Sequence, residues 1–374
     1  MVWMKKLTDI CDIQYGYAFD SKCFTEDSSY PALVRIRDVK RGYSETYYLG
    51  DYSDEYILSA GDLLVGMDGE FNIARWKMNG ALLNQRVCKL IAKNETNEEY
   101  LRFAMLKALK KIEQRTAFVT VKHLSAKELN KLELDVPDLS AQKKIAETLV
   151  RLETIIDRKR CELQKLDELI KARFVEMFGD AVANPMNWPV KKLKDLSVQI
   201  NSGNTPKGGS ENYVEEGITF FRSQNVWKDR LEMDDIAYID ADTHASMKRS
   251  SLKHGDILMT KTGRINTENS SLGRAALYMG EDDMANVNGH VYFIRLKAEV
   301  NNKFVLRILV SPEYRDLIRS VCVGGIDKRQ LNKEHIEEFP IICPPKDLVD
   351  SFIDFVEKVD KSKVAAMNNK PLWC

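Results

Sequence analysis

The 374-residue sequence lacks a charge excess of either sign. Its 56 Lys and Arg residues balance 56 Asp and Glu residues, so the formal net charge at pH 7 is zero. A basic surplus is typical of nucleic-acid-binding domains, and a large net charge with few apolar residues is typical of disordered chains. The composition indicates neither class. Because 44% of the residues are apolar and 9% aromatic, we expect packed cores, and the length predicts two or three domains.

The sequence also has little that could form a cross-link, a metal centre or a membrane anchor. Seven cysteines and five histidines are scattered along it, and no C-x-x-C pair occurs. We therefore expect neither a disulfide framework nor a metal site. No window approaches the roughly 18 apolar residues that span a bilayer, and the first ten residues have no signal-peptide core. These absences predict a cytoplasmic protein.

What the sequence does contain is an internal repeat. Four segments of the first half return in the second half, in the same order and with a growing offset. Such a pattern predicts two homologous domains, the second of which carries loop insertions. The matching segments are residues 5–10 (KKLTDI) with 191–196 (KKLKDL), Arg35–Val39 with Arg222–Val226, residues 58–65 (LSAGDLLV) with 252–259 (LKHGDILM), and Leu124, Leu129, Leu132 and Pro137 with Leu331, Ile336, Phe339 and Pro344.

Each copy combines short β-type runs, bounded by Gly or Asp, with at least one helix, at residues 97–115 and 303–320. This mixture predicts an α+β fold with two homologous mixed α/β domains related by an approximate two-fold axis. The predicted domains cover residues 1–139 and 181–345. Residues 140–180 and 346–374 are predicted to form helices outside them.

Residues 140–180 have the heptad pattern of a coiled-coil helix. From Ile145 to Met177 the steps alternate between four and three residues, and eight of the ten seam positions are apolar. We expect Ser140 to cap this helix and Gly179 to end it. A shorter apolar stripe after Pro345 predicts a second, antiparallel helix that packs on the first. The main seam residues are Leu149, Leu152, Ile156, Leu163, Leu166 and Ile170 in the first helix and Phe352 and Phe355 in the second.

Two similar globules held apart by long helices suit a ligand with the same approximate symmetry. Duplex DNA is the leading example, because successive sites on one face of the duplex repeat about every 34 Å. The architecture therefore predicts a module that recognises a bipartite DNA site.

The order globule, long helix, globule, helix resembles the specificity (S) subunit of type I restriction-modification systems over nearly the whole chain. The most specific part is the entry to the first helix, Leu134–Ala146 (LDVPDLSAQKKIA), which is similar to the family's Pro-x-x-x-x-Gln-x-x-Ile pattern at Pro137, Gln142 and Ile145. The resemblance implies that residues 1–139 and 181–345 are target recognition domains. Each would read one half of an asymmetric bipartite target in double-stranded DNA, and the helices would set the spacer.

The resemblance also implies partners. These are two adenine-N6 DNA methyltransferase subunits, which would dock on uncovered parts of the helical seam, and two restriction subunits. S-adenosylmethionine and ATP with Mg²⁺ are then expected in the partners and no cofactor in this chain. The predicted second helix is shorter than the family's usual second conserved region. Assembly from one chain, from a dimer of truncated chains, or with an altered spacer all remain open.

The residues agree with a subunit that carries no catalysis. A phosphate-binding loop requires G-x-x-x-x-G-K-[ST], but residues 203–209 read GNTPKGG, with glycine at the lysine position. An adenine methyltransferase would need an Asn/Asp-Pro-Pro-Tyr/Phe motif, and residues 184–187 (NPMN) lack the second proline and the aromatic residue. We therefore predict no catalytic residue.

Basic, amide and tyrosine side chains at corresponding points of the two repeats are candidates for DNA contact. Arg can bind guanine O6 and N7, Asn or Gln can bind adenine N6 and N7, and basic residues can contact phosphates. For the arginine clusters, the alternative is an ion pair at a strand end, and for the glycine loops it is an ordinary turn. The candidates are Tyr15, Tyr17, Arg35, Arg37, Arg86 and Lys122 in the first repeat, and Asn204, Lys207, Arg222, Gln224, Asn225, Lys261, Arg264, Lys328 and Arg329 in the second.

A different class of function fits the same architecture: a non-enzymatic coiled-coil scaffold that presents two protein-interaction modules. The two readings differ in their response to salt, because phosphate contacts make binding fall steeply with ionic strength.

Overall fold

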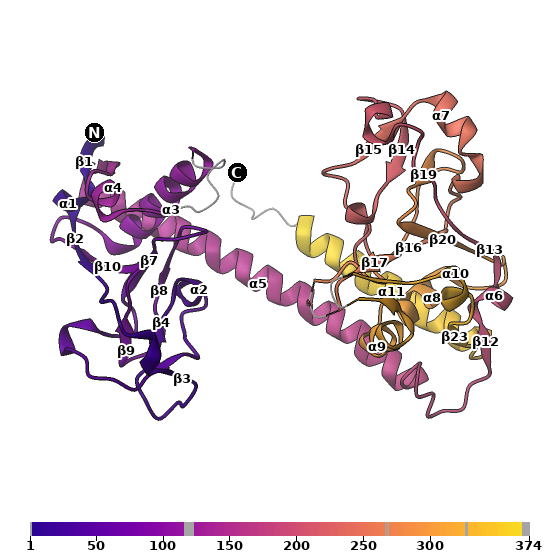
Figure 1. The fold of residues 1–374 in the computed structure, drawn as a ribbon, viewed down its shortest axis with the longest axis horizontal. Helices are drawn as coiled ribbons and strands as arrows, with labels where there is room; N and C mark the ends of the chain where they lie inside the picture. Colours follow the sequence, from indigo (N-terminus) through magenta and orange to yellow (C-terminus); the bar gives the residue numbers. More distant parts are fainter. Residues whose placement is uncertain (1, 116–122, 266, 268, 326–327, 369–374) are drawn as a thin grey trace. The chain divides into compact units, whose positions relative to one another are not determined.

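The computed structural model describes residues 2–115, 123–265, 267, 269–325 and 328–368 (Figure 1). The chain divides into two compact units, Met1–Arg160 (unit 1) and Cys161–Cys374 (unit 2). Each unit has its own hydrophobic core. The long helix α5, Leu139–Phe178, begins in unit 1 and ends in unit 2.

Unit 1 is built on a four-stranded antiparallel sheet in the order β2-β10-β7-β8. The 18-residue helix α3 packs on this sheet, and Asn97 caps it by accepting a hydrogen bond from Tyr100 N at 2.9 Å. A second sheet, β4-β9-β6, contains the parallel pair β4 and β9. The strands are β1 (Val2–Lys6), β2 (Cys11–Tyr15), β3 (Phe24–Thr25), β4 (Leu33–Val34), β5 (Tyr47–Tyr48), β6 (Ile57–Leu58), β7 (Leu63–Gly66), β8 (Asn72–Arg75), β9 (Ala81–Leu83), β10 (Val87–Ala92) and β11 (Glu133–Pro137). The helices are α1 (Leu7–Ile10), α2 (Ile36–Val39), α3 (Glu98–Arg115) and α4 (Ala126–Asn130), with the 3₁₀ turns η1 (Ser21–Cys23) and η2 (Asp54–Tyr56).

Unit 2 has the corresponding four-stranded sheet, β13-β20-β16-β18, and a second sheet, β15-β14-β19, with the parallel pair β14 and β19. It adds a small sheet, β17-β22-β21. The strands are β12 (Val190–Lys192), β13 (Ser197–Ser202), β14 (Ile218–Phe221), β15 (Ala237–Ile239), β16 (Ile257–Thr260), β17 (Thr262–Gly263), β18 (Ala275–Leu277), β19 (Ala285–Val287), β20 (Val291–Leu296), β21 (Val323–Gly324), β22 (Arg329–Gln330) and β23 (Pro340–Ile342). The helices are α6 (Leu193–Leu196), α7 (Ala241–Ser246), α8 (Asn302–Leu309), α9 (Pro312–Val321), α10 (Lys333–Glu337) and α11 (Lys346–Asn368), with η3 (Gly209–Asn212), η4 (Ser223–Asn225) and η5 (Lys248–Ser250).

The predicted internal repeat and the α+β fold class are confirmed. In unit 1, Leu7 N donates to Leu132 O at 2.7 Å, and in unit 2 the matching Leu193 N donates to Phe339 O at 2.9 Å. These bonds join matching segments, since β1 pairs with β11 and β12 pairs with β23. The same motifs therefore make the same long-range contacts in both units.

Helix α5 begins slightly earlier than expected. Asp138, not Ser140, provides the cap, because its Oδ1 accepts a hydrogen bond from Ala141 N at 3.0 Å. The expectation for Ser140 was wrong because Leu139 and Ser140 already lie inside the helix. Gly179 ends the helix as predicted, with φ at +74°, a conformation that glycine adopts without a steric cost.

Gln142 fixes the entry to α5. Its side chain is 1% exposed and accepts a hydrogen bond from Asn97 N at 2.8 Å. Its amide group donates to Pro137 O at 2.9 Å and to Glu95 O at 3.2 Å. The glutamine of the Pro-x-x-x-x-Gln-x-x-Ile pattern therefore ties the first turn of α5 to the segment that starts α3.

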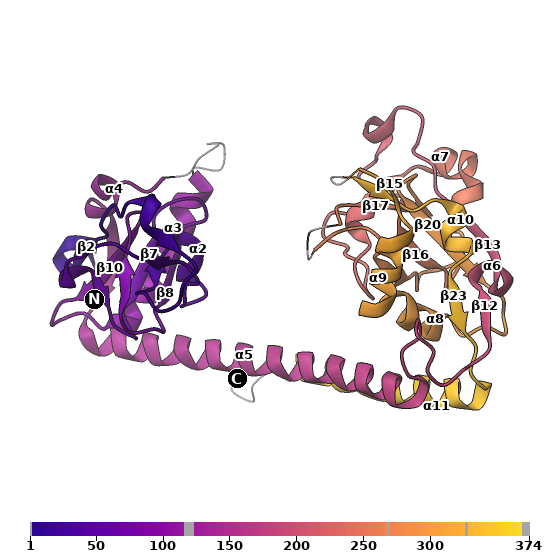
Figure 2. The ribbon, with the colours of Figure 1, turned by 60° about the horizontal axis from the view of Figure 1, so that its bottom comes forward.

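The apolar seam of α5 is covered only in part. Helix α11 packs antiparallel on the C-terminal part of α5, where Lys363 Nζ lies 2.7 Å from Asp167 Oδ1 and the Phe352 ring lies 5.5 Å from that of Phe174 (Figure 2). Ile170 is buried, and Leu166 and Phe355 pack against the same core. The 23 residues of α11, against 40 in α5, agree with the predicted shorter second helix.

The N-terminal part of the seam is different. Leu149 and Leu163 are half-buried, whereas Leu152 and Ile156 are 45% and 48% exposed. Among the residues described here, no helix is both long and apolar enough to cross a membrane.

Candidate nucleic-acid interface

In each unit, segments that are far apart in the sequence meet beyond the end of one central strand. In unit 1, Met67 N donates to Arg86 O at 2.8 Å, and Leu124 N donates to Met67 O at 2.7 Å. In unit 2, Lys261 N makes the matching bond to His290 O at 2.8 Å. We call this place the loop edge. It comprises residues 15–17, 67–68, 84–86 and 123 in unit 1, and residues 202–204, 261–264, 288–290 and 328–330 in unit 2.

Each loop edge has a glycine for which no other residue can substitute without strain. A Cβ added to Gly16 would lie 2.1 Å from Asn84 O, and one added to Gly203 would lie 1.8 Å from Val287 O. We expected these glycines to let the backbone approach phosphate. The structure shows that protein backbone already fills that space, so the glycines serve the close packing of two loops.

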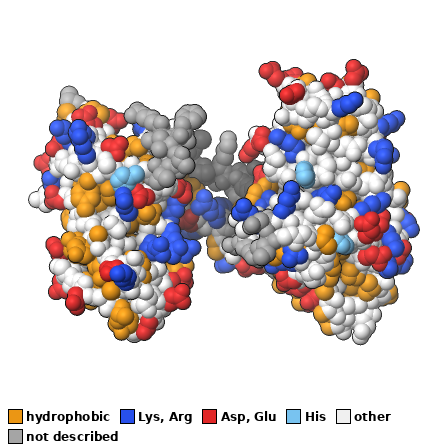
Figure 3. All heavy atoms as spheres, viewed as in Figure 1, with side chains coloured by type: hydrophobic (Ala, Val, Ile, Leu, Met, Phe, Trp, Pro, Cys, Tyr) orange, Lys and Arg blue, Asp and Glu red, His pale blue; other side chains and the backbone are white. Residues whose placement is uncertain are grey.

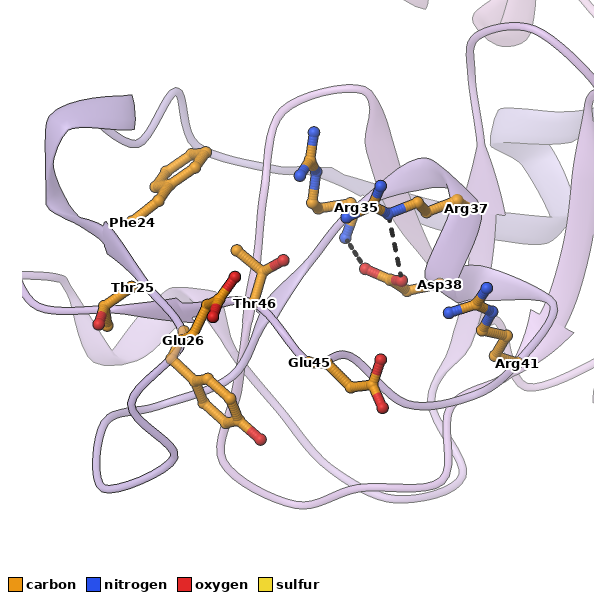
Figure 4. A pocket seen from close by; sticks show the side chains of 10 residues that line it. Phe24, Thr25, Glu26, Arg35, Arg37, Asp38, Arg41, Glu45 and Thr46 are labelled. Atoms are coloured by element: carbon orange, nitrogen blue, oxygen red, sulfur yellow. Dashed lines mark hydrogen bonds and ion pairs between the residues drawn. The ribbon is translucent and has the colours of Figure 1, made fainter. Parts of the chain in front are cut away.

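Arg35 and Arg37 lie beside an open hollow of about 710 Å³ in unit 1 (Figure 4). Both side chains are exposed, and Arg41 lines the same hollow. Asp38 holds this turn, since its buried carboxylate accepts a hydrogen bond from Arg35 N at 3.0 Å and lies 3.9 Å from Arg37 Nε. A neighbouring hollow of about 460 Å³ is lined by Arg35, Arg37 and Arg86 together. The structure thus brings together three predicted arginines from two separate segments.

Arg86 is held in one orientation by two neighbours. It has φ at +74°, which is uncommon for a residue with a side chain. Its Nη1 lies 3.1 Å from His123 Nδ1, and its Nε lies 3.5 Å from Asp68 Oδ2. His123 Nδ1 in turn contacts the carboxylate of Asp68. Arg41 and Asp68 have no sequence signal that would have marked them as members of this site. Lys122, the predicted neighbour of His123, lies outside the described residues.

The two tyrosines of the first glycine loop have different surroundings. Tyr15 donates from its hydroxyl to Asn130 Oδ1 at 2.8 Å, and burial raises the pKa of this hydroxyl to about 12. Tyr17 is 52% exposed, and its ring packs against Tyr56 with centroids 5.3 Å apart. Tyr17 therefore presents a supported aromatic face to solvent, whereas Tyr15 holds α4.

In unit 2 the three candidates at residues 222–225 are bound to the protein itself. Arg222 Nη2 lies 3.1 Å from Asp235 Oδ1, and Gln224 Nε2 donates to Asp235 Oδ2 at 3.0 Å. These two hydrogen bonds lower the pKa of Asp235, the Gln224 bond having the larger effect. Asn225 is 1% exposed and donates to Glu232 O and Asp235 O at 3.1 and 3.0 Å. The ion-pair alternative describes Arg222 in this structure, and DNA contact by these three residues stays a prediction.

The remaining candidates of unit 2 fall into two groups. Lys261 and Arg329 are half-buried, with Lys261 Nζ 5.7 Å from the Tyr292 ring centroid and Arg329 Nη1 donating to Cys322 O at 3.2 Å. The other four are exposed on loops, and they are Asn204, Lys207, Arg264 and Lys328. The exposed polar side chains thus differ between the two loop edges, although the backbone hydrogen bonds are the same.

Charge on the visible face of each unit is mixed. Basic and acidic side chains alternate over both units in Figure 3, in keeping with the net charge of zero. The described residues contain no group of three or more His, Cys, Asp or Glu placed to hold a metal ion.

Comparison with known proteins decides the family. The family model described as "Type I restriction modification DNA specificity domain" matches residues 2–168 and 185–372, so it matches twice and covers most of the chain. The chain belongs to this specificity family. The resemblance inferred from the repeat and from Leu134–Ala146 is therefore confirmed.

Two curated members of the type I specificity family and one solved structure are similar to the chain. The type I restriction enzyme EcoBI specificity subunit of Escherichia coli is 29% identical over 98% of this chain and 83% of its own length. The putative MjaX specificity subunit of Methanocaldococcus jannaschii is 21% identical over 43% of this chain and 36% of its own length. The crystal structure of the type I restriction-modification S subunit from M. genitalium has a TM-score of 0.53 at 14% identity and covers 98% of this chain and 93% of its own, which shows a shared fold.

Proposed function

We propose that this type I specificity chain reads an asymmetric, bipartite target in double-stranded DNA, with one half-site for each unit. The observation that supports this most directly is the pair of loop edges. Matching backbone hydrogen bonds build both edges, but Tyr17, Arg35 and Arg37 are exposed in or beside the first, and Asn204 and Lys207 in or beside the second. Equivalent scaffolds with different polar side chains are suited to reading different base sequences.

The same proposal gives the long helix two roles. It joins the two recognition units, and its exposed apolar side chains, among them Leu152 and Ile156, offer a docking face for helices of two adenine-N6 methyltransferase subunits. Exposed apolar residues that continue a coiled-coil seam are suited to such a partner. Two restriction subunits would complete the complex. We place S-adenosylmethionine and ATP with Mg²⁺ in those partners, and this chain acts by recognition alone.

Co-expression with the methyltransferase encoded beside the chain tests the proposal. Genome-wide mapping of N6-methyladenine should give one motif with two specific parts and a gap of fixed length. A methyltransferase expressed alone is the control and should leave that motif unmethylated. A complex that forms but methylates no bipartite motif would contradict the proposal, and binding that is independent of salt would favour a protein scaffold.

A further inference from the structure

A group of basic side chains in unit 2 surrounds Trp227, away from the residues discussed so far. The Arg274 guanidinium lies 3.8 Å from the Trp227 ring centroid, and that of Arg230 lies 5.3 Å from it. The charges of four basic residues, from α5, α9 and the segment before β18, act on the neighbouring Lys228. We call this group the Trp227 cluster, and its members are Lys171, Trp227, Lys228, Arg230, Arg274, Arg315 and Arg319.

The cations of the Trp227 cluster oppose one another. Burial lowers the pKa of Lys228, and repulsion from Arg315, Arg274, Lys171 and Arg319 lowers it further. Burial and then repulsion from Arg315 also lower the pKa of Arg274. Arg315 and Arg319 lie one turn apart on α9, where like charges disfavour a helix. A bound anion would relieve this repulsion.

Arg274 is the best-ordered cation of the group. It is 8% exposed, its Nε donates to Ser270 O at 3.0 Å, and its Nη2 donates to Asn269 O. A buried charge is normally paired with an opposite charge. Within the described ranges, Arg274 has backbone carbonyls and the Trp227 ring as neighbours but no carboxylate partner. Its guanidinium is thus fixed in place with its charge uncompensated.

Few acidic groups moderate the Trp227 cluster. Glu232 lies 2.6 Å from Arg230, and Asp316 lies 3.0 Å from Arg319. Asp229, although next to Lys228 in the sequence, forms its ion pair with Arg307. Lys228 makes no ion pair with any residue that the structure describes. The positive charge near Lys228 and Arg274 is therefore available to a ligand.

The chain itself leads from this cluster to the loop edge. Residues 264–274 run from the end of β17, in the loop edge, to Arg274. Helix α9, which carries Arg315 and Arg319, is followed directly by β21, and β21 pairs with β22 of the loop edge. A duplex bound at the loop edge carries one negative charge for about every 1.7 Å of its axis, so its phosphates extend well past the bases being read. This continuity favours DNA over an acidic protein as the ligand.

We propose that the Trp227 cluster binds backbone phosphates of the DNA beside the half-site that unit 2 reads. It adds affinity without reading sequence, because phosphates carry no base information. The proposal rests on the proposed DNA-recognition function. It is specific to unit 2, because the residue of unit 1 that matches Trp227 in the repeat is Lys40, whose Nζ forms an ion pair with Glu70 at 2.5 Å.

The test uses the assembled methyltransferase complex with a Lys228→Gln/Arg319→Gln chain. The control is Lys248→Gln/Arg249→Gln, which removes the same charge from two exposed residues of η5. Binding to a duplex with the mapped target and to an unrelated duplex is measured between 50 and 200 mM salt. Two lost phosphate contacts should make the plot of log affinity against log salt shallower by about 2, from about 0.9 per contact. Affinity for both duplexes should fall by the same factor, and the methylated motif should be unchanged.

Three results would overturn the inference. The variant could bind like the control, the methylated motif could change, or the complex could fail to assemble while its salt dependence stayed normal, which would indicate a protein partner. If the double variant does not fold, Lys228→Gln alone should give a change of about 1. The wild-type complex separates the two hypotheses. If it methylates a bipartite motif and only the variant result fails, the cluster is at fault, and if it neither methylates such a motif nor binds DNA, both proposals fail.

Discussion

At the scale of single residues, burial separates structural side chains from those available for recognition. Gln142 and Asn225 are each 1% exposed, and their amide groups bond to backbone atoms. Arg35 and Arg37 come from an equally short polar cluster, but their side chains are exposed beside a hollow. The same residue types therefore have opposite roles according to their depth.

Replacing Gln142 with leucine should destabilise unit 1. The change leaves Asn97 N and two carbonyl oxygens without partners, and each unsatisfied buried group costs about 1 to 3 kcal/mol. Urea unfolding of the full chain should show a lower midpoint for the first transition. Gln164→Leu, at an exposed position of the same helix, is the control and should change stability by about 0.5 kcal/mol or less. Equal effects of the two substitutions would contradict the anchoring role of Gln142.

Removing Arg35 and Arg37 together should relax one half of the DNA target. A bidentate arginine contact to guanine contributes about 1 to 3 kcal/mol of discrimination, so the methylated motif should become degenerate at one or two positions. Lys143→Ala/Lys144→Ala, at exposed positions early in α5, removes the same charge and should leave the motif intact. Degeneracy in the other half-site, read by mapping N6-methyladenine, would show that these arginines act elsewhere.

At the scale of elements, the long helix shows most clearly how a regular pattern meets its surroundings. The heptads of α5 continue through both units, but α11 covers only the C-terminal part. Leu152 and Ile156 therefore remain exposed in this chain although their spacing is that of a buried seam. A pattern shows which face is apolar, and the length of the partner helix decides how much of that face is covered.

Replacing Leu152 and Ile156 with glutamine should weaken assembly more than folding. Both side chains are largely exposed, so each change should alter unfolding by about 0.5 kcal/mol or less. Loss of a docking face should instead reduce co-purification of the methyltransferase subunit. Arg151→Gln/Arg158→Gln, on the same stretch of helix, is the control and should retain the partner. Undiminished co-purification by the first pair would place the docking surface elsewhere.

Small elements were harder to foresee than long ones. The sheet β17-β22-β21 consists of two-residue strands, and no periodic pattern predicts such pairs. Its strands pair because α9 and the segment after β16 converge on the same place. This sheet carries Arg329 and adjoins Lys328, so part of the candidate interface depends on contacts between residues more than sixty positions apart in the sequence.

At the scale of the whole molecule, the two units are the parts that an exchange experiment can separate. Replacing residues 1–139 with the matching segment of a related specificity chain should change one half of the methylated motif and leave the other half and the gap unchanged. The joint is structurally favourable because Gln142 bonds only to backbone atoms of residues 95, 97 and 137. A matching exchange of residues 181–345 should change the other half. Changes in both halves after one exchange would contradict independent reading.

The sequence by itself determined the family, the repeat and the long helix, because each depends on spacing along the chain. The repeat is visible as matching segments in order, the helix as a heptad pattern, and the helix entry as Pro137, Gln142 and Ile145. None of these signals requires knowledge of which residues meet in space.

Only the tertiary structure decided which polar residues are available for binding. Arg222 and Asn225 occupy the repeat positions of Arg35 and Asp38, but the loop that contains Asp235 covers them. The Trp227 cluster draws its cations from four separate segments, each unremarkable in the sequence. Burial and the summed charge at a point depend on how distant loops pack, and the local spacing of residues does not contain that information.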